Sequence, residues 1–427
     1  MTQRYDTYKD SGVQWIGEIP GHWGCVRLKY ITSKIGSGST PTGGADVYQD
    51  HGVIFLRSQN INNYGLELVD VAYISEDIHQ EMKGTHVHSG DILYNITGGS
   101  IGRCCLAPES LGEANVNQHV SIVRPRNVEN KFLLYSLQSE YCQTQMRFLQ
   151  TGGNREGLSA TAFKLFNVAL PPLSEQRSIV SYLDAKCGKI DEWVTKKQKE
   201  VEHLQEFKQR VIADAVTRGL NPHVKMKATN IPWLKEIPEH WEMSKISSHF
   251  RQRNEKVSDK DYPALSVSKQ GVTPQLDNVA LSNAEGTSRK LVKVGDYAVN
   301  SRSDRKGSCG VSKYEGSVSL ITIVLEPFNI NGEYIHYLFR SNLWVEEFYR
   351  NGRGIVADLW TTNYQMMKSM YMPVPPLSEQ KQIVSYFDAK TSQIDKLIAH
   401  ITKEIECIKE YKQRLISEVV TGQIKVC

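Results

Sequence analysis

The chain has 427 residues, with 51 basic against 47 acidic side chains and a formal net charge of +4. This length suffices for two or three domains, and 40% hydrophobic with 23% charged residues is ordinary for a globular protein. No run approaches the roughly 18 apolar residues that cross a bilayer, and the N-terminus lacks the apolar stretch of a secretion signal, so we expect a cytoplasmic protein without a membrane partner. Residues 1–170 carry 14 Lys/Arg against 16 Asp/Glu, which excludes a general basic field and leaves DNA binding to local patches.

A short motif, WIGEIPGHW (15–23), precedes a long segment of mixed character. Within this segment, GVIFLRS (52–58) and HVSIVRP (119–125) have the composition of strands. Residues 130–149 place apolar side chains at helical spacing. We therefore predict a first domain that combines a sheet with helices.

A long helix is predicted after the two prolines of PPLSEQRSIVSYLDAK (171–186). Ser174 can serve as its N-cap, and Glu175 places a negative charge on the first turn. Gly219 and Pro222 supply the stop. About 40 residues at 1.5 Å each make a rod of roughly 60 Å.

The second half repeats this order. WLKEIPEHW (233–241) matches the first motif, and PPLSEQKQIVSYFDAK (375–390) begins a helix that follows the first with a constant offset of 204 residues and ends near Gly422. About half of the positions from 171 to 217 are identical to their counterparts, which marks an internal repeat. The intervening segment, with strand composition at 320–327 and helical spacing at 332–350, hardly resembles the first. The sequence therefore predicts one frame, duplicated around two different α/β domains.

Both long helices carry apolar residues in steps of four and three, the pattern of a coiled-coil seam. Because the helices match in length, we expect them to pair with each other; the alternative is that each packs only on its own domain. Lys208 and Lys412 make the seam polar at one equivalent place in each helix, and Lys197 adds a second polar place in the first. The predicted apolar seam consists of Leu183, Ile190, Val194, Val201, Leu204 and Val211 in the first helix and Phe387, Ile394, Ile398, Ile401, Ile405, Ile408 and Leu415 in the second.

The sequence lacks the motifs of enzymes that act on DNA. The Pro-Pro pairs at 171–172 and 375–376 have neither the preceding Asn or Asp nor the following aromatic residue of an adenine methyltransferase. GGNREGLS (152–159) has the glycines of an ATP-binding loop without its lysine. His86 and His88 have no supporting ligand pattern. We therefore predict no catalytic residue, no metal site and no cofactor on this chain.

Polar loops between the predicted elements carry side chains suited to DNA. Arg, Asn and Gln match the edges of guanine and adenine, and free N–H groups and hydroxyls suit phosphates. An ordinary polar loop is the alternative for each of them, whereas the whole set in two unlike domains favours DNA binding. The candidates in the first half are Ser37, Thr40, Arg57, Gln59, Asn60, Asn95, Thr97, Arg103, Asn117, Gln118, Asn154 and Arg155; those in the second half are Arg251, Arg253, Lys256, Lys269, Asn300, Arg302, Arg305, Lys306 and Arg353.

The chain resembles the specificity subunits of type I restriction-modification systems. The resemblance rests on the two PPLSEQ helices, the two EIPxHW motifs, and GSGSTP, SGDILYNITGGSIG (89–102) and NVNQHVSIVRP (115–125) in the first half. VGDYAVNSRSDRKGSCG (294–310) is a looser version of the glycine-aspartate motif.

The resemblance implies two target-recognition domains, separated by two long helices that form an antiparallel coiled coil. It places the first domain at residues 1–170, the first helical spacer at 171–222, the second domain at 223–374 and the second spacer at 375–427. Each domain would read one half of a split, asymmetric site in double-stranded DNA. The frame would dock two methyltransferase subunits and, through them, restriction subunits with translocase and nuclease activity. S-adenosylmethionine, ATP and Mg are then expected on the partners; a solitary DNA-binding or coiled-coil adaptor protein is the alternative.

Overall fold

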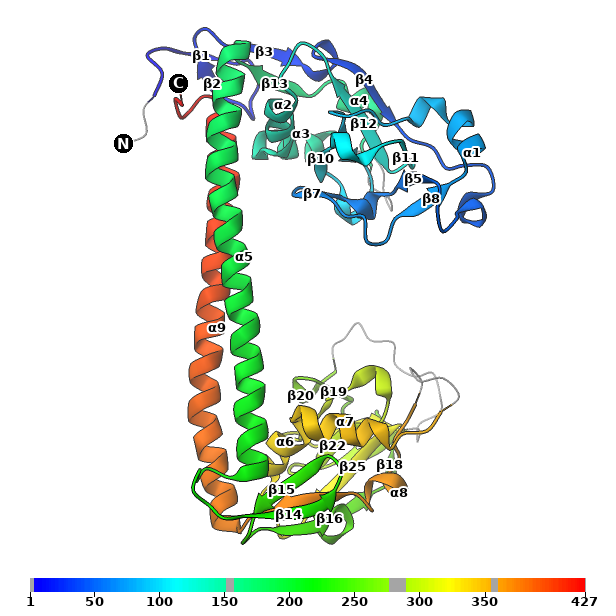
Figure 1. The fold of residues 1–427 in the computed structure, drawn as a ribbon, viewed down its shortest axis with the longest axis vertical. Coiled ribbons are helices and arrows are strands. Elements are labelled where there is room, and N and C mark those ends of the chain that lie inside the picture. Colours follow the sequence, from blue (N-terminus) through cyan, green and yellow to red (C-terminus); the bar gives the residue numbers. More distant parts are fainter. Residues whose placement is uncertain (1–3, 151–156, 276–288, 355–359, 427) are drawn as a thin grey trace. The chain divides into compact units, whose positions relative to one another are not determined.

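The computed structural model describes residues 4–150, 157–275, 289–354 and 360–426, and the chain divides into two compact units (Figure 1). Unit 1 comprises Met1–Lys197 with Lys403–Cys427, and unit 2 comprises Gln198–Thr402. Each unit contains one variable segment and part of both long helices.

Two sheets form the centre of unit 1. The larger one has the order β10-β9-β12-β4 and is antiparallel throughout. The smaller one has the order β11-β5-β8, in which β11 and β5 are parallel. One apolar cluster, with Leu93 and Ile122 from the larger sheet and Leu56 and Val116 from the smaller, joins the two. The strands are β4 (Thr32–Ser37), β5 (Val53–Leu56), β8 (Ala72–Ile74), β9 (Ile92–Asn95), β10 (Cys104–Leu106), β11 (Ala114–Val116) and β12 (Val120–Pro125), so the strands predicted at 52–58 and 119–125 are confirmed.

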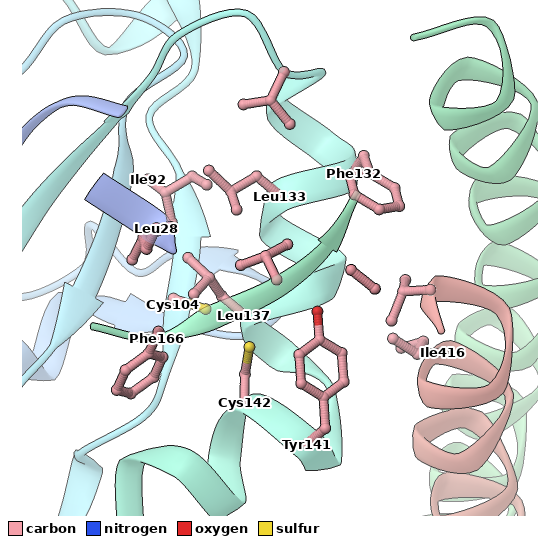
Figure 2. Close-up of a cluster of buried hydrophobic side chains, with 14 of the residues drawn as sticks. Leu28, Ile92, Cys104, Phe132, Leu133, Leu137, Tyr141, Cys142, Phe166 and Ile416 are labelled. Carbon is pink, nitrogen blue, oxygen red and sulfur yellow. The ribbon is translucent and has the colours of Figure 1, made fainter. Parts of the chain in front are cut away.

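Two helices pack on the larger sheet from the side of the long helices. The predicted helical segment 130–149 divides at Ser139 into α2 (Asn130–Gln138) and α3 (Glu140–Leu149), because the backbone of Ser139 is extended. Phe132, Leu137 and Tyr141 lie in one buried cluster with Ile92 of β9 and Ile416 of the second long helix (Figure 2). The smaller elements of unit 1 are β1 (Tyr8–Asp10), β2 (Glu18–Pro20), β3 (Gly24–Arg27), β6 (Ile61–Asn62), β7 (Gly65–Leu66), β13 (Asn167–Leu170), α1 (Glu76–Glu81) and α4 (Ala160–Phe163).

Unit 2 has the same larger sheet despite its different sequence. The order β17-β25-β22-β23 corresponds to β4-β12-β9-β10, and α6 (Gly332–Arg340) and α7 (Asn342–Arg350) again break at an extended serine, Ser341. The second layer differs, with the antiparallel order β18-β21-β24 and a hairpin β19-β20. The remaining elements are β14 (Met226–Ile231), β15 (Leu234–Pro238), β16 (Glu242–Lys245), β17 (Phe250–Arg253), β18 (Lys256–Val257), β19 (Leu265–Ser268), β20 (Gly271–Pro274), β21 (Arg289–Val292), β22 (Tyr297–Asn300), β23 (Cys309–Val311), β24 (Gly316–Ser319), β25 (Thr322–Pro327), β26 (Tyr371–Val374) and α8 (Tyr364–Met367).

The two long helices are α5 (Leu173–Arg218) and α9 (Leu377–Val420). Each begins at the leucine after the two prolines, so Ser174 lies inside the first turn and the prediction that it caps the helix was wrong; Ser378 has the equivalent place in α9. As predicted, each helix ends near a glycine with positive φ. Helix α5 ends directly before Gly219 (φ +74°), and α9 ends two residues before Gly422 (φ +75°).

The long helices pair as an antiparallel coiled coil. In unit 1 the Nζ atom of Lys412, late in α9, donates to Asp191, early in α5, at 2.7 Å. In unit 2 Lys208, late in α5, donates to Asp395, early in α9, at 2.6 Å. The polar seam positions therefore form the same ion pair twice, 204 residues apart. The predicted apolar seam residues are all buried or half-buried, and several of them also join the domain cores, so each helix packs both on its partner and on its own domain.

The repeated motifs EIPxHW and PPLSEQ bind each other in both units. In unit 1 the Glu175 carboxylate accepts from Trp23 Nε1 at 3.0 Å and lies 2.6 Å from His22 Nε2. In unit 2 Glu379 has the same partners, Trp241 at 3.0 Å and His240 at 2.7 Å. A Cβ at Gly422 would come within 3.2 Å of the Trp23 ring, and one at Gly219 would come equally close to Trp241. We call this arrangement of helix start, helix end, Trp and His the clamp.

The glutamine after the clamp glutamate attaches the variable segment to the frame. Gln176 accepts from the backbone N–H of Glu129, just before α2, at 2.8 Å and donates to the Pro171 carbonyl at 2.8 Å. Gln380 accepts from Asn331, just before α6, at 2.8 Å and donates to Pro375 at 2.9 Å. Both side chains are about 1% exposed. The repeated sequence is thus explained by repeated contacts.

Candidate nucleic-acid interface

Three polar loops of unit 1, at residues 36–44, 94–103 and 115–119, meet at one place and carry predicted DNA contacts. Thr40 Oγ1 donates to Gln118 Oε1 at 2.6 Å, which joins loop 36–44 to loop 115–119. Thr97 of loop 94–103 lies 2.7 Å from His119 Nδ1. A Cβ on Gly38 would overlap the Val116 carbonyl, so this close approach requires glycine. Ser37, Thr40 and Gln118 are exposed and Thr97 is half-buried, which leaves hydroxyl and amide groups at the surface of the cluster.

The loop after β5 is organised by an acidic residue that sequence reasoning missed. Asp70 Oδ2 accepts from Gln59 Nε2 at 2.8 Å, and the Asp70 carbonyl accepts from Arg57 Nη2 at 3.1 Å. Asn60 is 1% exposed, and its Oδ1 accepts from the Arg57 backbone N–H at 2.9 Å. Gln59 is exposed and Arg57 half-buried, so these two can reach solvent whereas Asn60 holds the turn from inside.

Two further asparagines support the loops of unit 1 from within. Asn95 is fully buried and donates to the Ser58 carbonyl at 2.8 Å and to Ser100 Oγ at 3.1 Å. Asn117 Oδ1 accepts from the His119 backbone N–H at 3.1 Å. Arg103 is exposed, with Nη1 3.4 Å from Asn62 Oδ1. Asn154 and Arg155 lie outside the described residues. As DNA contacts, all of these stay predictions.

The loop between β22 and β23 gathers the cations of unit 2. Arg302 donates twice to Asp304, at 2.9 Å each, and Lys306 lies 3.1 Å from Glu346 on α7. Arg305 is exposed. Asn300 is 7% exposed, and its Oδ1 accepts from the Arg302 backbone N–H at 3.2 Å, which is again a supporting role.

The predicted loop around Arg353 joins the same cluster. The backbones of Arg302 and Arg353 both form β-bridges to Thr361. The Arg353 side chain is exposed. Loops that are about 50 residues apart in the sequence are thereby brought together, as loops 94–103 and 115–119 are in unit 1.

Arg253 has a structural partner that its sequence position did not reveal. Its guanidinium donates from Nε to Asp296 Oδ2 at 2.6 Å and from Nη2 to Oδ1 at 3.1 Å, and Asp296 is only 3% exposed. The hydrogen bonds to Asp296 raise the pKa of Arg253. In unit 1 Asp91 and Arg124 form the same bidentate pair at 2.7 and 2.8 Å. The aspartate of the glycine-aspartate motif therefore binds an arginine of the sheet.

The other predicted cations of unit 2 are exposed. Arg251 lies over the ring of Phe328, with the guanidinium carbon 5.2 Å from the ring centre. Lys256 belongs to β18, and Lys269 lies in the turn between β19 and β20. These three side chains project from the second layer or the edge strand and can reach an anionic ligand without breaking a buried pair.

Comparison with known proteins assigns the family. Residues 20–203 and 238–407 match the model of the type I restriction modification DNA specificity domain. The chain therefore belongs to the family of type I restriction-modification specificity subunits, which recognise DNA sequences.

Relatives match along nearly the whole chain. A putative type I restriction enzyme MjaX specificity subunit of Methanocaldococcus jannaschii is 25% identical over 435 residues, 96% of either chain. The EcoKI specificity subunit of Escherichia coli K12 is 19% identical over 441 residues, 96% of this chain and 90% of that one. A chain from a solved type I R-M system has the same fold, with a TM-score of 0.68 at 16% identity over 94% of this chain and 98% of that one. Among the described residues no helix is long and apolar enough to cross a bilayer.

Proposed function

We propose that this chain recognises a bipartite, asymmetric site in double-stranded DNA, with one half read by each unit. The proposal rests on the combination of equal clamps with unequal loops. Equivalent hairpins, β9-β10 and β22-β23, end in the neutral turn Gly98–Ser100 in unit 1 and in the charged turn Ser303–Arg305 in unit 2. Unlike loops on one repeated support suit two unlike half-sites.

The repeated frame also supports docking of two copies of one partner. The clamps and the Lys–Asp pairs recur with the 204-residue offset of the long helices, so the frame offers equivalent surfaces twice. We propose that two methyltransferase subunits bind there and that restriction subunits join through them. The chain itself is then non-catalytic, with S-adenosylmethionine on the methyltransferase and ATP and Mg on the restriction subunits.

The proposed DNA contacts are exposed side chains of the loops and of the edge strands β17 and β18. In unit 1 these are Ser37, Thr40, Gln59, Arg103 and Gln118; in unit 2 they are Arg251, Lys256, Lys269, Arg305, Lys306 and Arg353. Arg57, Thr97 and Arg302 are half-buried at the same loops and complete the set. Arg302 and Lys306 would exchange carboxylate partners for phosphates or guanine edges on binding.

Co-expression with the cognate methyltransferase tests the proposal. We expect the two proteins to co-purify and to methylate adenines within one split sequence, whereas neither the isolated chain nor the isolated methyltransferase transfers methyl groups to it. Methyl transfer by the highly purified isolated chain would refute the non-catalytic role. DNA binding without any association with a methyltransferase would favour the solitary DNA-binding protein instead.

A further inference from the structure

We propose that unit 1 binds a transition-metal dication, Zn²⁺ in the first place, between α1 and the segment that leads into β11. Glu76 and His79 are three residues apart on α1, and Glu113 immediately precedes β11. One ligand atom from each of the three residues lies within 4.8 Å of the others. An imidazole with two carboxylates is a donor set suited to Zn²⁺, with one or more positions left for water.

The hydrogen bonds around His79 leave one ring nitrogen ready to bind a metal. The Asn115 amide nitrogen donates to Thr85 Oγ1 at 2.7 Å and to the Met82 carbonyl at 3.2 Å. The remaining Asn115 oxygen must therefore accept, and it lies 2.5 Å from His79 Nδ1. The proton is thereby assigned to Nδ1, and Nε2 keeps its lone pair.

This arrangement is the one in which a second residue orients a metal-binding histidine. A histidine ligand commonly donates its other N–H to a fixed acceptor, which sets its tautomer and direction. His79 is only 3% exposed, and the parallel ring of His86 stacks on it at a centre-to-centre distance of 3.9 Å. Among the described residues no partner binds His79 Nε2. The His79 ring is therefore held in place by its Nδ1 hydrogen bond and by the stacked His86 ring, as a preformed ligand requires.

The two carboxylates supply the charge that such a cation needs. Glu76 and Glu113 are exposed, and neither forms a salt bridge with a described residue. Glu76 Oε1 accepts from Gln80 at 2.8 Å, which leaves Oε2 for the metal. Two carboxylates close together repel each other, and a dication between them removes this repulsion.

Zinc titration of the full chain tests this site. We expect wild-type protein to bind one Zn²⁺ in calorimetry, its melting temperature to rise with Zn²⁺ but not with equal Mg²⁺, and Co²⁺ to bind without a thiolate charge-transfer band. Glu76→Gln and Glu113→Gln should each weaken this binding by about tenfold or more. Both residues are exposed, so the variants should fold. Asp77→Asn, at an exposed carboxylate beside the site, is the matched control and should bind like wild type.

The metal site would be refuted by an unchanged Zn²⁺ isotherm in both glutamine variants, because binding would then come from other histidines or thiols. It would also be refuted by no Zn²⁺ binding at all. The melting temperature without metal identifies any variant that is misfolded. If a glutamine variant is misfolded, the corresponding Glu76→Asp or Glu113→Asp variant, which keeps the negative charge, is tested instead. Unchanged Zn²⁺ affinity in both aspartate variants together with a normal melting temperature supports a site that needs these carboxylates, and normal folding of both variants with no Zn²⁺ binding refutes it. None of these outcomes depends on DNA recognition.

Discussion

The two units share a frame and a central sheet, and they differ in their second layer and in their loops. Unit 1 has a parallel strand pair, β11-β5, in its smaller sheet. In unit 2 the strands β18-β21-β24 are antiparallel, and a single parallel bridge, Ala264 to Ser317, joins β24 to the residue before β19. The larger sheets have the same strand order, although the sequences hardly resemble each other. Burial, rather than residue identity, is what the two sheets have in common: all four residues of β9 and all four of β22 are buried. The two strands fill the same buried place with different apolar side chains, and each ends in a buried asparagine.

The buried Asp–Arg pair shows how the two sheets preserve an interaction with different residues. Arg124 precedes Pro125 at the end of β12, and the corresponding residue before Pro327 in β25 is Glu326. In unit 2 the arginine comes instead from the edge strand β17, where Arg253 reaches Asp296 and lies 3.5 Å from Glu326. Both units therefore have the buried aspartate, whereas the arginine that pairs with it comes from β12 in unit 1 and from the edge strand β17 in unit 2.

The clamps should be equally important in both units. Trp23→Ala and Trp241→Ala each remove a fully buried indole and one hydrogen bond, so we expect each to lower stability by about 3–5 kcal/mol. Hydrogen exchange should locate the loss in the unit that carries the change. Trp193→Ala, at a half-buried position of α5, is the control and should cost less. A large loss of stability in one of the two variants with none in the other would show that the two clamps are not equivalent.

Removing Arg253 should destabilise unit 2 about as much as removing Arg124 destabilises unit 1. Arg124→Met and Arg253→Met each leave a carboxylate buried without its cation, which should destabilise the respective unit by about 3 kcal/mol. The double variants with Asp91→Asn or Asp296→Asn should recover part of the loss. Thermal unfolding of wild type, the two arginine variants, the single Asp91→Asn and Asp296→Asn variants and the two double variants measures this. Additive losses of stability in the double variants would contradict the pairing.

The loop between β22 and β23 in unit 2 should contribute more to the salt dependence of DNA binding than the loop between β9 and β10 in unit 1. Replacing Arg302, Arg305 and Lys306 together with alanine should lower the slope of log affinity against log salt by about one for each phosphate that is no longer bound, and cost about 1–3 kcal/mol wherever a base was read. Arg103→Ala in unit 1 should change the slope by about one at most. Lys396→Ala, exposed on α9, serves as the control. Equal affinity and equal slope for the triple variant and wild type would count against DNA binding by this loop.

Acid should weaken the clamp of unit 1. Burial alone raises the pKa of Glu175, but hydrogen bonds from His22, Trp23 and Tyr5 favour the carboxylate and lower it overall. An acid with a lowered pKa in the folded state adds stability above its ordinary pKa of 4.5, and this stability is lost as the pH falls through the folded-state value. The difference in melting temperature between wild type and Glu175→Gln should therefore shrink below pH 4.5. A difference that stays constant to lower pH would contradict the lowered pKa, and Glu192→Gln on the exposed side of α5 is the control.

Local patterns predicted the frame well, because repeats, heptads, prolines and glycines act over short distances. The two long helices and the strands at 52–58, 119–125 and 320–327 are confirmed. The breaks at Ser139 and Ser341 were not predictable from proline or glycine. At both places the serine hydroxyl bonds the carbonyl three residues earlier, at Ser136 and Leu338, and the chain then starts a new helix.

Contacts between distant segments limited the prediction of the site. Asp91 and Arg124 are 33 residues apart, and Arg253 and Asp296 are 43 apart, so no local pattern pairs them. Asn60, Asn95 and Asn300 have the side chains that suit bases, yet their burial gives them loop-supporting bonds. An asparagine in a polar loop looks the same in the sequence whether its side chain points inward or outward. The common strand order of the two variable segments could not be predicted either, because their sequences hardly resemble each other.

The central claim is that each unit reads one half of the DNA site. Each variable segment enters and leaves the frame across a two-stranded ladder, with Gly24 opposite Leu170 in unit 1 and Glu242 opposite Val374 in unit 2. A chain in which Gly24–Leu170 also replaces Glu242–Val374 should therefore keep both clamps. Mapping of methylated adenines in cells that express this chain with its methyltransferase should show an inverted repeat of one original half-site. Methylation that retains both original halves would contradict the account.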